Sequence, residues 1–419
     1  MPDTAMDKRD IVIAGGGMVG ISLALKLGEL LPAHVSILLV EGFPFHAPND
    51  SRSDYHPSFD ARSTALSYSS RLIYENMGLW PGLSEWLCPI ESIHVSSRGH
   101  FGSTLLNPDD HGWPALGYVV ENAWLGRGLA GALHQQARVE VWSPARVTGA
   151  RASGPGMRLT LSGAQSDELD AGLLLVADGA DSGLRKALGV AASEKSYGQK
   201  AVIANVATAK AHDGCAYERF TDEGPLAMLP LCPAPGAQHR SALVWTMPPA
   251  RADYFSVCEP AEFLSELQQR FGYRLGRLQQ VSERHCYSLS LVESAEQVRQ
   301  GLVVMGNAAH ALHPVAGQGF NLALRDVAEL AAALARGVAA GSAVGDLAVL
   351  KGYERRQRAD QTRTIGFSDK VPALFMQSDP LLGLSREIAL SGMDFLPGLK
   401  QEFVRYAAGV AGMETRADG

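Results

Sequence analysis

A glycine-rich turn between two apolar segments constrains this chain more than any other feature of its sequence. The apolar residues 10–14 lead into three glycines in G-x-G-x-x-G spacing, which are Gly15, Gly17 and Gly20. Residues 18–31 then follow a helical period, and residues 35–40 (VSILLV) form a second apolar run. Strand, glycine turn, helix and strand in this order predict a βαβ unit that binds a dinucleotide.

Each glycine has a separate task in such a turn. Gly15 permits the tight turn, Gly17 lets the backbone approach a pyrophosphate, and Gly20 lets the helix pack closely on the strand. The helix N-terminus presents unpaired N–H groups and partial positive charge to that anion. Glu41 follows the second strand, where a carboxylate accepts hydrogen bonds from ribose hydroxyls. NAD and FAD share this device, and a purely structural glycine turn is the remaining alternative.

The composition excludes several classes of protein. Hydrophobic residues make up 46% of the 419 residues, enough to bury a large core, so disorder is not the dominant state. The net charge of −7 argues against a nucleic-acid partner, because such proteins carry a basic surplus. The sequence has no apolar run near the roughly 18 residues of a membrane span, and residues 1–10 are polar. We therefore expect a cytoplasmic protein, with contact to a membrane surface left open.

Cysteine and histidine spacing predicts no metal site. The five cysteines are scattered and no pair has C-x-x-C spacing, so zinc and thioredoxin-like sites are excluded and reduced thiols are expected. His310 and His313 are three residues apart, but no nearby carboxylate or third histidine completes a ligand set.

Two further segments combine a buried strand with a polar turn. Residues 173–185 read LLLVADGADSGLR, so an apolar run ends at Asp178 and Gly179. Residues 302–326 read LVVMGNAAHALHPVAGQGFNLALRD, in which a strand ends at Gly306 and a glycine turn precedes a helix. Together with the first glycine turn, in this order and spacing, these segments closely resemble the aromatic hydroxylases of the para-hydroxybenzoate hydroxylase fold, which are single-component FAD monooxygenases. The resemblance covers nearly the whole chain.

The fold class that we expect is α/β. It comprises a Rossmann-like FAD-binding domain, an inserted antiparallel-sheet substrate domain and a helical C-terminal region. Spaced apolar strands between turns in the middle third predict the antiparallel sheet, whereas residues 63–77 and 120–137 read as helices. The expected boundaries are 7–75, 106–185 and 296–350 for the FAD-binding domain, 76–105 and 186–295 for the substrate domain, and 351–419 for the C-terminal helical region.

The resemblance implies a cofactor site beyond the first turn. Asp178 belongs to the mid-chain segment, and Asn307, where most family members have Asp, keeps an acceptor for a ribityl hydroxyl and adds donors. The turn at Gly317, Gln318 and Gly319 lets backbone N–H groups approach a flat ring. The helix that follows places its N-terminus toward the flavin, where it would stabilise the anionic reduced form. The remaining residues implied in cofactor binding are Phe320, Asn321, Arg62 and Arg127, and Arg185 either braces the loop or touches the ligand.

The resemblance also implies a reaction. NADPH or NADH reduces the FAD, O2 reacts with the reduced flavin, and one oxygen atom passes to an electron-rich ring. Pro314 is expected to line the face where oxygen reacts. His310 and His313 are candidates for a general base because histidine titrates near neutrality, with an orienting role in the loop as the alternative. We take His313 and Pro314 as the candidate catalytic residues.

Shorter strings point to one branch of the family. Residues 118–122 (YVVEN), 197–199 (YGQ), 216–220 (AYERF) with 224–231 (GPLAMLPL), and 367–370 (FSDK) resemble the ubiquinone-biosynthesis hydroxylases, and most of all 2-polyprenyl-6-methoxyphenol hydroxylase. This resemblance implies a polyprenylated phenol and O2 as substrates. The alternatives are a sister hydroxylase acting at another ring carbon, an isoprenoid flavin reductase or epoxidase, and a non-catalytic FAD-binding subunit of a biosynthetic assembly.

Residues 351–363 (KGYERRQRADQTR) carry five basic and two acidic side chains. The simpler interpretation is a solvated helix face. The alternative is a docking surface for anionic lipid or for a protein complex of ubiquinone biosynthesis, which would help a very apolar substrate to reach the site.

Overall fold

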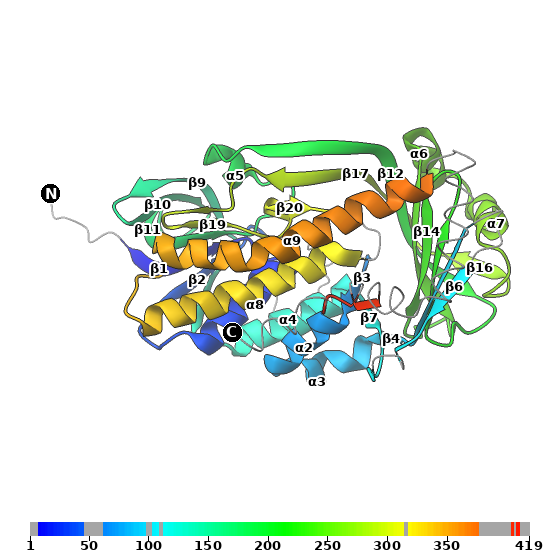
Figure 1. The fold of residues 1–419 in the computed structure, drawn as a ribbon, viewed down its shortest axis with the longest axis horizontal. Helices are drawn as coiled ribbons and strands as arrows, with labels where there is room; N and C mark the ends of the chain where they lie inside the picture. The colour runs from blue at the N-terminus through cyan, green and yellow to red at the C-terminus, as the bar shows by residue number, and fades with distance from the viewer. Residues whose placement is uncertain are drawn as a thin grey trace.

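Two large β-sheets stand side by side, linked by long strands, and one long helix reaches from the first sheet toward the second (Figure 1). The computed structural model describes residues 7–45, 62–97, 103–108, 112–313, 317–376, 404–405 and 408–410. Within these residues, no helix is both long enough and apolar enough to cross a membrane. The two sheets define the predicted α/β fold with its antiparallel second sheet, so the expected fold class is confirmed.

The first sheet is built on the βαβ unit that the glycine turn predicted. β1 (Lys8–Ala14) pairs in parallel with β2 (Ile37–Val40) on one side and with β11 (Glu168–Val176) on the other. These strands are apolar on both faces because helices cover one face and further strands the other, as parallel sheets require. The strands that complete the sheet are β8 (Val139–Trp142), β9 (Arg146–Ser153), β10 (Gly156–Ser162), β18 (Val298–Arg299) and β19 (Leu302–Val304).

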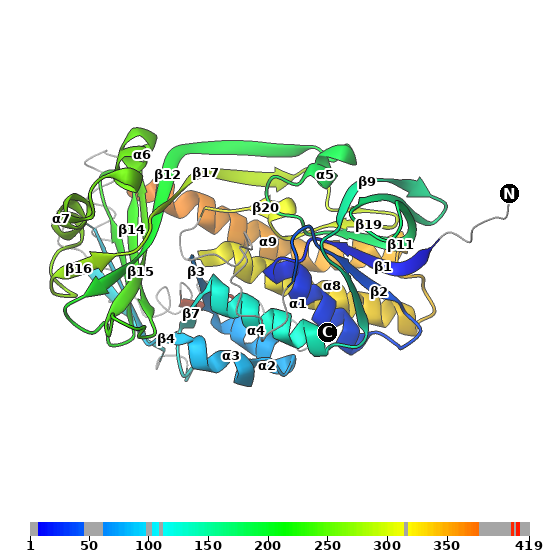
Figure 2. The same ribbon diagram turned by 180° about the vertical axis from the view of Figure 1, so that it is seen from behind.

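Four helices pack as a layer on the first sheet (Figures 1 and 2). They are α1 (Met18–Leu30), α4 (Asn122–Gln135), α8 (Gln318–Ala339) and α9 (Leu347–Met376). The helix predicted after the third glycine-rich segment is α8, and α9 follows it. Gly341 separates the two helices with φ +85°, a conformation that favours glycine and ends a helix.

The second sheet has nine strands and is antiparallel except where β13 (Cys215–Phe220) runs parallel to β5 (Ser92–Ser97). Helices α6 (Pro249–Val257) and α7 (Pro260–Phe271) cover one face, over a core that contains Trp245. The opposite face lines a cavity toward the first sheet. The other strands are β6 (Ser103–Leu106), β12 (Ala192–Thr208), β14 (Pro225–Leu231), β15 (Arg240–Met247), β16 (Leu278–Val281), β17 (His285–Ser294) and β20 (His310–Ala311).

Two of the predicted helices are wrong in part, because some of their residues form strands of a small third sheet. Residues 63–77 are not one helix, because β3 (Ser63–Ser67) precedes α2 (Tyr68–Asn76), and residues 120 and 121 belong to β7 (Gly117–Glu121). β7 pairs with β3 and with β4 (Cys88–Ile90), so partners far apart in the sequence decide these strands. The remaining short elements are α3 (Trp80–Leu83), η1 (Ser84–Trp86), α5 (Gly183–Ala187) and η3 (Gly306–Ala308).

The proposed domain boundaries stay a prediction. The strands of residues 192–294, together with β5 and β6, form the second sheet, as the substrate domain required. β20 also joins this sheet through β17, although it comes from the 296–350 segment that we assigned to the FAD-binding domain. The chain therefore crosses between the sheets more than once, and the cavity lies where it crosses.

Candidate functional site

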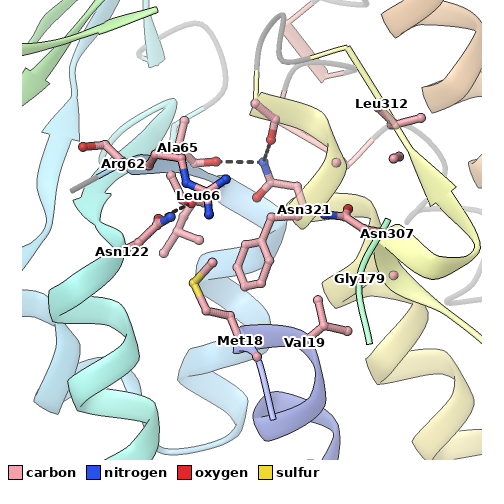
Figure 3. A pocket seen from close by; sticks show the side chains of 18 of the residues that line it. Met18, Val19, Arg62, Ala65, Leu66, Asn122, Gly179, Asn307, Leu312 and Asn321 are labelled. Carbon is pink, nitrogen blue, oxygen red and sulfur yellow. Dashed lines mark hydrogen bonds between the residues drawn. The ribbon is translucent and has the colours of Figure 1, made fainter. Parts of the chain in front are cut away.

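One large cavity opens between the carboxyl ends of β1, β2 and β11 and the inner face of the second sheet (Figure 3). Its volume is about 1200 Å³. Pockets for a single small molecule usually measure about 300–1,000 Å³. The cavity is therefore large enough to hold a cofactor and a substrate together, and its position at the carboxyl edge of a parallel sheet is typical of such sites.

The first glycine turn forms one end of this cavity. Gly15 and Gly17 line it, and Gly15 has φ +109°. A Cβ on Gly15 would stand 2.5 Å from the backbone oxygen of Ala177, so no larger residue fits. Gly20 does not line the cavity, and a Cβ there would stand 1.8 Å from the oxygen of Gly15, in keeping with a role in close helix packing.

Glu41 lies beside this turn at the end of β2 and lines the cavity. Its carboxylate accepts hydrogen bonds from the backbone N–H groups of Gly16 at 2.5 Å and Phe43 at 2.8 Å. Each carboxylate oxygen can accept more than one hydrogen bond, so these contacts are compatible with ribose hydroxyls at the same group. The carboxylate thus fixes the glycine turn and stands where a ribose would lie.

A second helix N-terminus opens into the same cavity. Gly317 and Gly319 line it at the start of α8, and Gly317 has φ +58°. Neither α1 nor α8 has a side-chain cap at its N-terminus, so their first backbone N–H groups are left for a ligand or for water. Two helix N-termini make the cavity favourable for anionic groups. Phe320 also lines the cavity, whereas Gln318 is buried outside the lining.

Asn321 lines the cavity and connects three elements around it (Figure 3). Its amide nitrogen donates to the carbonyl oxygens of Ala65 and Gly317, each at 2.8 Å. Its amide oxygen accepts from the Ser67 backbone at 2.8 Å and from the Ser70 hydroxyl at 2.7 Å. This side chain lines the cavity, but its four hydrogen bonds connect α8 to β3 and α2 and fix the position of the α8 turn.

Three more of the predicted cofactor residues come together at the cavity wall. Asp178, Arg62 and Asn307 all line it, from the end of β11, the start of β3 and the η3 turn. Burial raises the pKa of the Asp178 carboxyl above its ordinary value. The Arg62 guanidinium lies 5.0 Å from the centre of the Tyr287 ring, which holds it against the second sheet.

Two predicted arginines lie elsewhere. Arg127 is exposed on α4, packs on the Trp124 ring at 5.1 Å and does not line the cavity. Arg185 is buried and donates to the carbonyl oxygen of Ala308 at 2.6 Å, so it braces the η3 turn. Of the two roles left open for Arg185, the structure shows the bracing one.

The two histidines have different surroundings. The His310 ring lies 3.0 Å from a carboxylate oxygen of the buried Asp326 and is outside the cavity lining. His313 lines the cavity, and burial lowers the pKa of its imidazole to about 4. Its carbonyl oxygen accepts from Ser368 at 3.0 Å, and its ring meets Tyr197 edge-on at 4.9 Å. Pro314 lies outside the described residues.

These residues fit an FAD molecule. The glycine turn, which a Cβ would fill, and the two uncapped helix N-termini suit a pyrophosphate and an electron-rich ring. The carboxylate of Glu41 suits the hydroxyls of a ribose. Fold and cavity thus define the class as an FAD-binding protein. The chain belongs to the FAD binding domain family, whose model matches residues 8–367.

Known proteins support this class over the whole length of the chain. The ubiquinone hydroxylase UbiL of Rhodospirillum rubrum is 33% identical over 96% of this chain and 89% of its own length. The 3-demethoxyubiquinol 3-hydroxylase of Escherichia coli is 29% identical over 96% of this chain and 98% of its own. Among solved structures, p-nitrophenol 4-monooxygenase PnpA of Pseudomonas putida has the same fold, with a TM-score of 0.77, 18% identity and coverage of 97% and 99%. The protein is an FAD-dependent aromatic monooxygenase, as the resemblance implied.

Sequence reasoning missed three charged residues that line the cavity. Arg146 and Asp181 stand at the cofactor end, and Glu218 stands on the second sheet. Arg146 lies over the Phe43 ring at 5.2 Å. A signal for Glu218 was present in residues 216–220 (AYERF), because a carboxylate alternates there with apolar residues, but the sequence does not say which face is turned inward.

Proposed function

We propose that this protein hydroxylates the ring of a polyprenylated phenol in ubiquinone biosynthesis, with 2-polyprenyl-6-methoxyphenol as the favoured substrate. The observation that carries the proposal is the composition of this large cavity. Its cofactor end is made of glycines and helix N-termini, and its other end is the apolar face of an antiparallel sheet. The named activities of the relatives from Rhodospirillum rubrum and Escherichia coli support the same substrate class.

When bound, FAD would supply the redox chemistry that couples oxidation of NADPH or NADH to the transfer of one oxygen atom from O2. The chain itself binds and orients. The α1 and α8 N-termini would hold the anionic parts of the cofactor, and Asn321 keeps the α8 turn in place. The residues of the second sheet would hold the aromatic ring and exclude water from it.

The test uses FAD-loaded protein, NADPH or NADH, ¹⁸O2 and 2-polyprenyl-6-methoxyphenol in mixed micelles. We expect one ¹⁸O atom in the ring for each hydroxylated product, at the ring carbon that becomes the second quinone oxygen. The position of the new hydroxyl is read by mass spectrometry and NMR. A hydroxyl at another carbon, or turnover only with a differently substituted phenol, would indicate a sister hydroxylase.

Other outcomes distinguish the remaining alternatives. Two added hydrogen atoms in the prenyl chain without ¹⁸O would identify a reductase, and ¹⁸O in the chain rather than the ring would identify an epoxidase. Cofactor-loaded protein that oxidises NADPH or NADH without forming any product from the prenylated phenol would support a non-catalytic assembly subunit. Each of these results would contradict the proposal.

The route by which an apolar substrate arrives is part of the same proposal. On α9 the side chains of Arg355, Arg356 and Arg358 are exposed, while Tyr353 and Gln357 of the same helix are buried. Arg356 pairs with Glu329 of α8, which leaves fewer charges for a partner. If this face docks on anionic lipid or on a partner protein, replacing Arg355 and Arg358 with glutamate lowers recovery with vesicles and activity on long-chain substrate. Unchanged recovery and activity would favour a solvated face.

A further inference from the structure

One ionisable side chain stands in the middle of the apolar face that lines the substrate end of the cavity. Glu218 lies on β13, and its neighbours on the same face of that strand are Ala216 and Phe220. On the adjacent strands it faces Ala227 of β14 and Val95 of β5. All four neighbours are apolar and also line the cavity, so the carboxylate is presented to whatever molecule occupies this space.

No donor among the described residues forms a hydrogen bond or ion pair with the Glu218 carboxylate, and this half-buried side chain lines the cavity. Two other carboxylates, by contrast, have cationic partners. Glu121 pairs with Arg240 at 2.5 Å, and Glu223 lies 3.3 Å from Arg270. A buried carboxylate without a partner costs free energy, so its position is better explained by a ligand that supplies a donor.

Burial places the titration of this group in the neutral range. The apolar surroundings raise the pKa of the Glu218 carboxyl to about 7. A base is most effective when its pKa lies near the working pH, because it is then ionised and still holds a proton well. Geometry and titration therefore point to the same use of this side chain.

We propose that Glu218 is a catalytic residue that accepts a hydrogen bond from the phenolic hydroxyl of the substrate and removes its proton. This rests on the proposed function, because it requires a phenol in the cavity. The O–H bond breaks, the proton passes to a carboxylate oxygen of Glu218, and the electron pair remains on the phenolate oxygen and is shared with the ring. The ring becomes more electron-rich and more reactive toward an electrophilic oxygen. The phenolic oxygen regains a proton at the end of the turnover, so the step needs no co-reactant.

Other charged groups of the cavity stand on other elements. The strands that flank Glu218, β5 and β14, contribute only apolar side chains to the lining, and β6, β12 and β15 add apolar residues and threonines. Across the cavity, the charged or titratable residues of the described lining are Glu41, Arg62, Arg146, Asp178, Asp181 and His313. Since the pKa of His313 is lowered to about 4, the group expected to titrate near pH 7 at the substrate end is Glu218.

The first experiment measures binding rather than turnover. FAD-loaded wild type and Glu218→Gln are titrated calorimetrically, at pH 5.5 and 8.5, with 2-polyprenyl-6-methoxyphenol and with its methyl ether. The phenol keeps its own proton at both pH values, since phenols ionise near pH 10. We expect wild type to bind the phenol about tenfold more tightly at pH 8.5, because hydrogen bonds to charged groups are stronger. The ether, which has no proton to donate, and the Gln variant should show no such gain.

The second experiment measures product formed per NAD(P)H oxidised. Glu218→Gln should lower the hydroxylation rate by about 100-fold or more, release more of the reducing equivalents as peroxide, and lose the inflection near pH 7. Glu218→Asp should restore part of the rate. The control is Glu194→Gln, which makes the same change at an exposed carboxylate on β12 of the same sheet. Far-ultraviolet circular dichroism and flavin content establish that each variant is folded and loaded.

The outcomes separate this proposal from the proposed function. Wild-type hydroxylation together with a Glu218→Gln variant that keeps its rate, coupling and pH profile would overturn the role of Glu218. Tight binding of the phenol with the same affinity at both pH values would overturn it as well. Absence of any hydroxylated phenol from wild type would refute the proposed function, while pH-dependent phenol binding that is lost in Glu218→Gln would still establish the contact.

Discussion

Replacing Glu218 with glutamine should make the protein more stable at alkaline pH even though it impairs the enzyme. The carboxyl group ordinarily ionises near pH 4.5, and burial raises its pKa to about 7 in the folded protein. Between these values the folded state holds more protons than the unfolded chain, so the free energy of unfolding falls as the pH rises through this window. Above pH 7 the ionised carboxylate destabilises the fold.

The magnitude follows from the two pKa values. At about 1.4 kcal/mol per pH unit, the full effect above pH 7 is roughly 3 kcal/mol. Water reaches the cavity side of Glu218 and reduces that figure, so we expect the stability difference between Glu218→Gln and wild type to grow by about 2 kcal/mol from pH 5 to pH 8. A glutamine has no charge to bury at either pH.

Urea unfolding of FAD-loaded protein at pH 5, 6, 7 and 8 measures this difference, with FAD in fixed excess so that cofactor binding contributes equally. Glu194→Gln is the control, because its exposed carboxylate should leave the pH dependence of wild type unchanged. A difference that is the same at all four pH values would refute our account of Glu218. A variant less stable than wild type at pH 8 would show that the carboxylate has a stabilising partner instead.

Three further predictions concern the cofactor end and the helical layer. Gly20→Ala should abolish FAD binding, read as loss of the visible flavin absorbance, because its Cβ would stand 1.8 Å from the Gly15 oxygen, whereas Gly131→Ala on α4, whose Cβ meets nothing within 4 Å, should retain FAD. Asp326→Leu should lower the free energy of unfolding by about 3–5 kcal/mol in urea titrations, because this buried carboxylate accepts from Gln357 and Gln361 as well as facing His310. His313→Ala should reduce coupling of NAD(P)H oxidation to product while leaving the pH profile between 6 and 9 unchanged, since the pKa of this histidine is lowered to about 4.

Each of these has a contrary outcome. Yellow Gly20→Ala protein would mean that α1 can shift to make room. An Asp326→Leu variant as stable as wild type would mean that the buried polar network adds nothing to stability. A displaced pH profile in His313→Ala would assign the histidine a proton-transfer role after all.

The cofactor half of the site was predictable because its signals are local. A tight turn that needs glycine at Gly15, and a carboxylate at Glu41 after the next strand, follow directly from a short segment of sequence. The structure places both at the cavity. The strands of the parallel sheet were predictable for a related reason, because strands buried on both faces read as continuous apolar runs.

Features decided by distant partners were harder to predict. β3 was taken for the first turn of a helix, since its preference for a strand comes from pairing with β7, about fifty residues further on. Arg127 was assigned to the cofactor through resemblance, but α4 turns it outward over Trp124. Leu125, Leu129 and Leu133 form the buried face of α4, so the apolar period of this helix favours an exposed Arg127.

The search for a base shows most clearly how environment outweighs residue type. Histidine was the natural candidate in the sequence because its ordinary pKa lies near neutrality. The fold places His310 against Asp326, and burial lowers the pKa of His313 to about 4. The same physical effect, loss of water around a charged group, raises the pKa of Glu218 to about 7. Desolvation thus moves the imidazole of His313 out of the neutral range and a carboxyl into it, and the base that we propose is a residue type whose ordinary pKa lies well below neutrality.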